Sequence, residues 1–267
     1  MQTLITLYIA VFGLIIGSFL NVCIYRIPAK QSVISPPSHC TSCGTRLKAL
    51  DLVPVFSYIF LRGKCCYCGE KVSARYPIVE SLTSIAFVLL YFRFSISMEF
   101  FAAAVFSCIL ICEAFVDFDL KIIPDEFVLV GMLSGAALFA YNLFYPVSLY
   151  GDRAWYNPVI GIACGAGVLL LVAIIGSIIY KTEDAMGMGD VKLLAAVGLF
   201  LGWRLTLVAL FLTVLSAAVI SLVLIISRKI NGKSTVAFGP FIAIGTFITM
   251  LYGWNIIELY LGFIPKQ

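Results

Sequence analysis

Five long runs of this sequence contain no charged residue, and they constrain the fold more than any other feature. The runs are 1–25, 127–151, 154–180, 205–227 and 234–257. A helix of about 20 apolar residues crosses the hydrocarbon core of a bilayer. Composition agrees, because 62% of the residues are hydrophobic and only 12% are charged, whereas soluble chains carry about 25% charged residues. The sequence therefore predicts an all-α polytopic protein whose main partner is the lipid bilayer, and it excludes a chain built only of one or two water-soluble domains.

The apolar segments predict about eight transmembrane helices. Their approximate ranges are 3–24, 77–93, 98–118, 124–146, 158–180, 190–203, 205–227 and 235–257. Pro77, Pro124 and Pro158 stand where three of these helices would begin, which is where a missing N–H costs least. The first run has no basic residue before it, so we interpret it as an uncleaved span with its N-terminus outside, not as a cleaved signal peptide.

The segment between the first two spans is strongly basic. From Arg26 to Arg75 it carries eight basic residues against two acidic ones, and such an excess holds a loop in the cytoplasm. We expect three parts: a first span at 1–25, a small cytoplasmic module at 26–76 and a multi-span domain at 77–267. No basic helix or basic-aromatic interleaving points to a nucleic acid partner.

Four of the nine cysteines in the chain form two Cys-x-x-Cys pairs inside the basic module. They are Cys40, Cys43, Cys65 and Cys68, with 21 residues between the pairs. Two such pairs place four thiolates around a tetrahedral zinc ion. Gly44 and Gly69 follow the pairs, where a knuckle turn needs a positive φ. Because the cytoplasm is reducing, disulfides are the poorer interpretation.

Alternatives to this zinc set remain open at the level of sequence. Cys66 makes the register of the second pair ambiguous, and His39, the only histidine, is a substitute ligand or simply a turn residue. The competing interpretation is that some of these four cysteines are buried thiols that bind no metal. With four sulfurs available, no position is left for catalysis, so the predicted zinc is structural. Another thiolate-preferring metal is also compatible with the pattern.

Three acidic residues are expected at the ends of apolar spans. Asp117 and Asp119 end the third span, and Asp190 opens the sixth in Gly187-Met188-Gly189-Asp190. Alternation of the spans brings both groups to the same membrane face, where ionisable residues are functional candidates. Two close carboxylates share one proton, so that one acts as general base for a water that attacks a peptide carbonyl.

A structural role is the competing interpretation of these acids. Asp190 would then be a helix N-cap, and Asp117 and Asp119 would be interfacial loop residues. Glu113 lies four residues before Asp117 and hence on the same helical face. It would either tune the pair of carboxylates or form a separate polar contact.

Several motifs in one fixed order resemble those of the type IV prepilin peptidases. The match covers roughly residues 13–243 and includes Gly17-Ser18-Phe19-Leu20-Asn21-Val22, Tyr25-Arg26-Ile27-Pro28, the two Cys pairs, Arg75-Tyr76-Pro77-Ile78-Val79-Glu80, the Asp117 segment running into Ile123-Pro124-Asp125, Gly187-Met188-Gly189-Asp190 and Phe238-Gly239-Pro240. The resemblance implies a bifunctional enzyme of the bacterial cytoplasmic (inner) membrane. It would cleave the basic leader of a prepilin or pseudopilin, and then methylate the new N-terminus with S-adenosylmethionine.

The resemblance also assigns roles to particular residues. It places the catalytic pair at Asp117 and Asp190, with Asp119 fitting the first position less well. Methylation belongs largely to the N-terminal cytoplasmic part, where the carry-over reaches no further than Glu80 and the Cys module. No glycine-rich Rossmann turn is present, because Gly161, Gly165 and Gly167 lie in an uncharged helix and indicate close helix packing.

Two other functions compete with this assignment. A transporter or channel with acids in its pathway explains intramembrane carboxylates without water chemistry, although its acids would lie nearer the midplane. A presenilin-like protease shares Gly-x-Gly-Asp, but the partner motifs of that family are missing. The sequence does not identify the substrate pilin or the oligomeric state.

Overall fold

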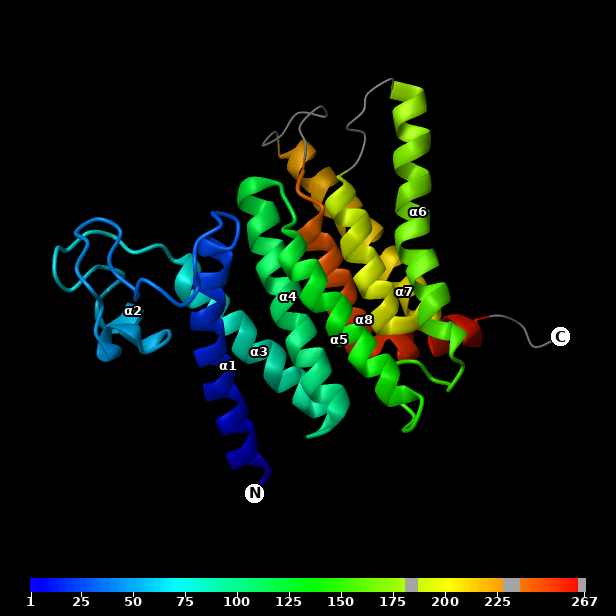
Figure 1. Ribbon diagram of the computed structural model, residues 1–267, viewed down its shortest axis with the longest axis horizontal. Coiled ribbons are helices and arrows are strands. Elements are labelled where there is room, and N and C mark those ends of the chain that lie inside the picture. Colours follow the sequence, from blue (N-terminus) through cyan, green and yellow to red (C-terminus); the bar gives the residue numbers. More distant parts are fainter. Residues whose placement is uncertain (181–186, 228–235, 264–267) are drawn as a thin grey trace. The chain divides into compact units, whose positions relative to one another are not determined.

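The computed structural model describes residues 1–180, 187–227 and 236–263. Within them the regular structure is helical, with two isolated β-bridges and no longer strand. The chain divides into two compact units, Met1–Ile96 and Ser97–Gln267 (Figure 1). The predicted all-α membrane architecture is therefore confirmed in outline.

The first unit is built on two long helices that pack closely. Its elements are α1 (Gln2–Arg26), the 3-10 helix η1 (Ala49–Leu52), α2 (Phe56–Phe60) and α3 (Arg75–Phe94). A Cβ added at Gly13 or Gly17 of α1 would lie 2.6 Å from the α3 backbone, so these glycines allow the helices to touch. Asn21 of α1 donates its side-chain N–H to the Tyr76 carbonyl over 3.2 Å. A polar residue in an apolar span thus bonds across to its neighbour.

The second unit contains five helices, three of which pack against α7. The five helices are α4 (Met98–Leu120), α5 (Asp125–Asn142), α6 (Tyr156–Tyr180), α7 (Met188–Ile226) and α8 (Gly239–Gly262). Helix α7 packs against α5, α6 and α8, and α4 packs against α5 and α8. On α6, Gly161 faces the Gly198 carbonyl and Gly165 faces the Leu194 carbonyl. The expected close packing is confirmed for these two glycines, whereas Gly167 has no neighbour within 4 Å.

Helix α7 folds back on itself at Gly202. This residue has φ 71° and ψ 169°, a conformation outside the helical region that is open essentially to glycine alone. Gly165 lies beside both the Leu194 carbonyl and the Thr206 side chain, so the residues before and after the break run antiparallel. Figure 1 shows the second half returning toward the end of the unit where α7 begins. The expected spans 190–203 and 205–227 are therefore the two halves of this hairpin.

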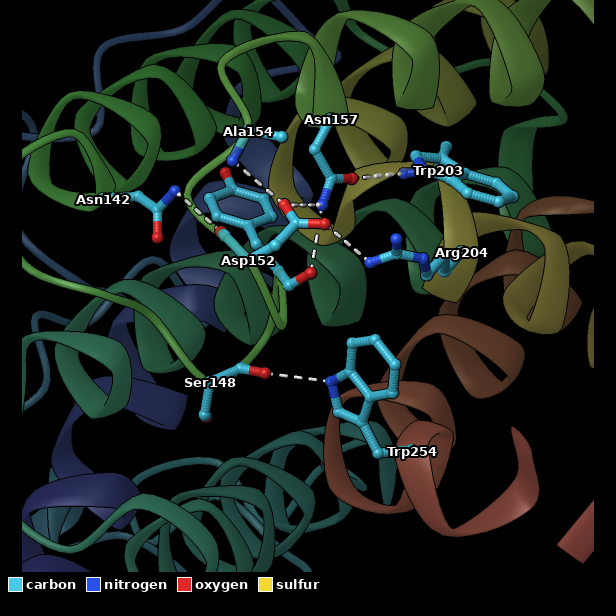
Figure 2. Close-up of polar contacts among 9 residues, drawn as sticks. Asn142, Ser148, Asp152, Ala154, Asn157, Trp203, Arg204 and Trp254 are labelled. Atoms are coloured by element: carbon cyan, nitrogen blue, oxygen red, sulfur yellow. Dashed lines mark hydrogen bonds and ion pairs between the residues drawn. The ribbon is translucent and has the colours of Figure 1, made fainter. Parts of the chain in front are cut away.

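The loop between α5 and α6 and the first turn of α6 stabilise the break. The Tyr150 hydroxyl donates to the Leu199 carbonyl over 2.9 Å, and the Trp203 N–H donates to Asn157 Oδ1 over 3.1 Å. These bonds satisfy backbone groups on both sides of the break. Figure 2 shows how Asp152 joins the network, accepting from Arg204 Nη1 over 2.7 Å and from Asn157 Nδ2 over 2.9 Å. Burial alone would raise the pKa of Asp152, but these donors outweigh it and lower the pKa.

Six helices of the described residues are long and apolar enough to cross a membrane. They are α1, α3, α4, α6, α7 and α8. Helix α5 occupies the expected fourth span but is not among them, and α7 counts once although it folds back. The first half of α7, from Met188 to the break at Gly202, is about 20 Å long and short for a full crossing. A total of about eight crossings therefore stays a prediction.

Candidate active site and metal centre

Asp117 lies in the last turn of α4 and is held by the start of α8. Its side chain is only 6% exposed, and its Oδ2 accepts the Gly239 N–H over 2.7 Å. A Cβ at position 239 would lie 2.9 Å from Oδ2, so a glycine is required for this approach. Helix α4 ends where Lys121 turns left-handed and donates its N–H to the Asp117 carbonyl. The motif Phe238-Gly239-Pro240 therefore contacts Asp117 directly through the Gly239 N–H. The sequence did not predict this contact.

Asp190 lies in the first turn of α7, and the glycines before it shape its surroundings. A Cβ at Gly187 would lie 3.2 Å from Asp190 Oδ2, and a Cβ at Gly189 would lie 2.8 Å from the Ile123 side chain. Gly189 thus lets α7 approach the segment between α4 and α5. Asp190 Oδ1 is buried and has no hydrogen-bond partner among the described residues, so it can bind a substrate group or a water.

The two aspartates line one cavity of about 360 Å³. Its other walls are Lys121, Ile122 and Ile123 after α4, Asp125 at the start of α5, and Gly187, Met188, Gly189 and Lys192 around the start of α7. The structure therefore brings Asp117 and Asp190 together from residues 73 positions apart in the sequence. Asp119, the alternative to Asp117, is not among the lining residues.

Glu113 is the third acid of this region. It lies one helical turn before Asp117, is fully buried, and neither of its carboxyl oxygens has a partner among the described residues. No cation compensates it there, so a charged Glu113 would be costly in the interior of the unit.

The candidate metal centre lies in the first unit. The sulfurs of Cys40, Cys43, Cys65 and Cys68 all lie within 4.8 Å of one another. Both pairs adopt the same knuckle: the Gly44 N–H donates to the Cys40 carbonyl, and the Gly69 N–H donates to the Cys65 carbonyl, each over 2.9 Å. The φ angles of these glycines are 70° and 75°, as the sequence pattern predicted. Four converging sulfurs fit a tetrahedral metal ion.

Backbone donors around the sulfurs of Cys40 and Cys65 favour the thiolate, which is the form that binds a metal. The N–H groups of Cys43 and Ser42 lower the pKa of the Cys40 thiol, and those of Tyr67 and Cys68 lower the pKa of the Cys65 thiol. Hydrogen bonds of this kind stabilise the charged form of the ligand.

The two alternative ligands lie outside the sulfur cluster. Cys66 Sγ contacts Asp51 Oδ1 at 3.4 Å, and His39 Nδ1 lies 3.1 Å from the Pro37 carbonyl oxygen. Neither belongs to the group of four, so the register of the second pair is Cys65 with Cys68.

Glu80 joins the Cys module to α3. Its side chain is 6% exposed, and its Oε2 accepts the Val55 N–H over 2.7 Å. Val55 itself has φ 61°, which is unusual for a β-branched residue. The geometry gives Glu80 a structural contact, and nothing in it assigns a step of methyl transfer to this carboxylate.

Models of known protein families match segments of both units. The model of the bacterial peptidase A24 N-terminal domain matches residues 11–94, and that of the type IV leader peptidase family matches residues 104–222. A prepilin leader peptidase/N-methyltransferase of Bacillus subtilis strain 168 is 35% identical over 94% of this chain and 96% of its own length. Proteins with the same name from Aeromonas hydrophila and Dichelobacter nodosus are 34% and 32% identical, over 94% and 97% of this chain and 91% and 95% of their own lengths.

No solved structure matches the chain. The two family models, the identity to full-length relatives and the order of the motifs nevertheless agree. The chain therefore belongs to the type IV leader peptidase family.

Proposed function

We propose that this protein is a membrane aspartic peptidase that removes the basic leader of type IV prepilins or pseudopilins and then N-methylates the new N-terminus. The name prepilin leader peptidase/N-methyltransferase, shared by its relatives, supports both activities. The observation that carries the peptidase assignment is the single cavity lined by Asp117 and Asp190. A transporter receives no support from these relatives.

In this mechanism the two carboxyl groups share one proton. The N–H that Asp117 accepts from Gly239 suits a carboxylate, so we assign Asp117 as the general base that takes a proton from the attacking water. Asp190, with an unpartnered oxygen, would be the acid that polarises the scissile carbonyl. Proton transfer to the departing amine then completes cleavage, as in other aspartate pairs.

The location of the site fits a substrate that is itself embedded in a membrane. A prepilin carries a basic leader followed by an apolar helix, so its scissile bond would lie at the headgroup level. Both aspartates lie in the terminal turn of an apolar helix, and they line the same cavity. We place this face in the cytoplasm of the bacterial inner membrane, because the positive-inside rule would hold the basic segment 26–75 there and alternation of the spans would bring both aspartates to the same side.

We propose zinc as the ion of the four-cysteine site. Cys40, Cys43, Cys65 and Cys68 would fill all four positions, so the ion would hold the 26–76 module together and take no part in peptide cleavage. S-adenosylmethionine would supply the methyl group. Both described cavities lie in the second unit, so no residue is assigned to that cofactor.

The test is cleavage of a full-length prepilin coexpressed with the enzyme. Asp117→Asn and Asp190→Asn should each abolish the processed band at unchanged membrane levels, because each removes one carboxyl of the pair. Asp119→Asn is the matched control, two residues from Asp117, and should retain cleavage. Loss of cleavage in Asp119→Asn with full activity in Asp117→Asn would overturn the assignment.

A further inference from the structure

A second cavity opens beside the one that holds the aspartates. It has a volume of about 480 Å³ and is lined by Asp125, Glu126, Val128, Leu129 and Met132 of α5 and by Lys192 of α7. Asp125 and Lys192 line both cavities, and their side chains form an ion pair of 2.7 Å. The second cavity, here called the α5 groove, therefore begins at the edge of the candidate active site.

The α5 groove changes from acidic to apolar along the helix. Asp125 and Glu126 stand in the first turn of α5, and the next two turns contribute Val128, Leu129 and Met132. From Asp125 to Met132 the helix rises about 10 Å. Asp125 is already paired with Lys192. Glu126 is exposed and has no ion pair or hydrogen bond within the described part of the chain, so its charge is available to a ligand.

An acidic end followed by an apolar stretch is complementary to a partner that has a basic end followed by an apolar helix. A segment with basic residues followed by an apolar helix would place its positive charges at Glu126 and its helix against Leu129 and Met132. Its junction would then lie between Glu126 and Leu129, about one helical turn from the ion pair that lines both cavities. A substrate of a leader peptidase has this polarity, and opposite charges on the two partners set the register of docking.

We propose that the α5 groove is the docking site of the prepilin substrate, with Glu126 contacting the basic leader and Leu129 and Met132 contacting the first turns of the apolar helix. This inference rests on the proposed function. It adds a substrate-binding surface beside the cavity that the two aspartates line.

The contact between Glu126 and the basic leader is tested with purified enzyme in detergent and two prepilin substrates. One substrate has its natural basic leader, and in the other the basic leader residues are replaced by glutamate. Glu126→Lys should raise KM for the basic leader about tenfold with little change in kcat, and should lower KM for the acidic leader. A merely structural defect would impair both substrates alike, so equal impairment would overturn the proposal.

The contact with the apolar helix is tested with a matched pair of variants on α5. Leu129 and Leu133 are both 60% exposed, but only Leu129 lines the groove. Leu129→Trp would fill the groove and should raise KM at least several-fold, whereas Leu133→Trp should leave cleavage unchanged. Unchanged KM in Leu129→Trp would overturn the proposal and leave the groove to lipid.

These experiments distinguish failure of the docking proposal from failure of the proposed peptidase function. Loss of cleavage in the wild type itself, or its persistence in Asp117→Asn and Asp190→Asn, would count against the proposed function. Normal wild-type cleavage with no substrate-dependent effect of Glu126→Lys would count against the docking site alone.

Discussion

At the scale of single residues, Glu113 is a buried acid whose carboxyl group the described residues leave unsatisfied. It is fully buried and neither oxygen has a partner within the described residues. Glu99, on the same helix, is the matched comparison, because its carboxyl group is hydrogen-bonded: its Oε1 accepts the Ser148 N–H over 2.8 Å. An unsatisfied buried polar group costs about 1–3 kcal/mol, and an apolar residue of similar volume removes that cost.

We therefore expect Glu113→Met to raise the free energy of unfolding by about 1–3 kcal/mol, and Glu99→Met to lower it. Thermal unfolding of the two variants in the same detergent would measure this difference. A lower melting temperature for Glu113→Met would contradict the expectation and show that the carboxyl group has a partner, such as a buried water. If that variant is stabilised but cleaves prepilin more slowly, Glu113 supports the aspartate pair instead of the fold.

At the scale of elements, charge-free runs predicted the long helices because a membrane span depends on local composition. The same reasoning separated 190–203 from 205–227, close to the observed break at Gly202. It did not predict the contact between Asp117 and Gly239, nor the ion pair of Asp125 with Lys192. These pairs are 122 and 67 residues apart, and local periodicity carries no signal for which helix ends meet.

The break in α7 yields a test at the same scale. Gly202→Ala would place a Cβ against Asn157 Oδ1 and force φ 71° on a residue with a side chain, so it should lower the free energy of unfolding by at least about 2 kcal/mol. Gly167→Ala is the control, since Gly167 is helical and has no neighbour within 4 Å. It should be neutral or stabilise by up to about 1 kcal/mol. Equal effects in thermal unfolding would show that the hairpin does not depend on Gly202.

At the scale of the whole molecule, the candidate metal site and the candidate peptidase site belong to different compact units. The four sulfurs lie in Met1–Ile96, whereas both aspartates and the cavity that they line lie in Ser97–Gln267. The sequence predicted both sets of residues, because Cys-x-x-Cys spacing and an acid in an apolar helix are local signals. The division at Ile96 places α3 with α1, which local composition does not indicate.

Loss of the metal should therefore separate the two activities. Cys43→Ser removes one of four ligands, so we expect the 26–76 module to lose its fold, because a small module with few buried apolar side chains depends on its metal. Trypsin should then cut within this module, and incorporation of labelled methyl groups into cleaved pilin should fall. Prepilin cleavage should persist, since Asp117 and Asp190 belong to the other unit. Cys66→Ser is the matched control, because Cys66 lies outside the cluster, and it should keep its metal content and its resistance to trypsin. Loss of cleavage in Cys43→Ser together with an intact second unit would show that the peptidase depends on the module.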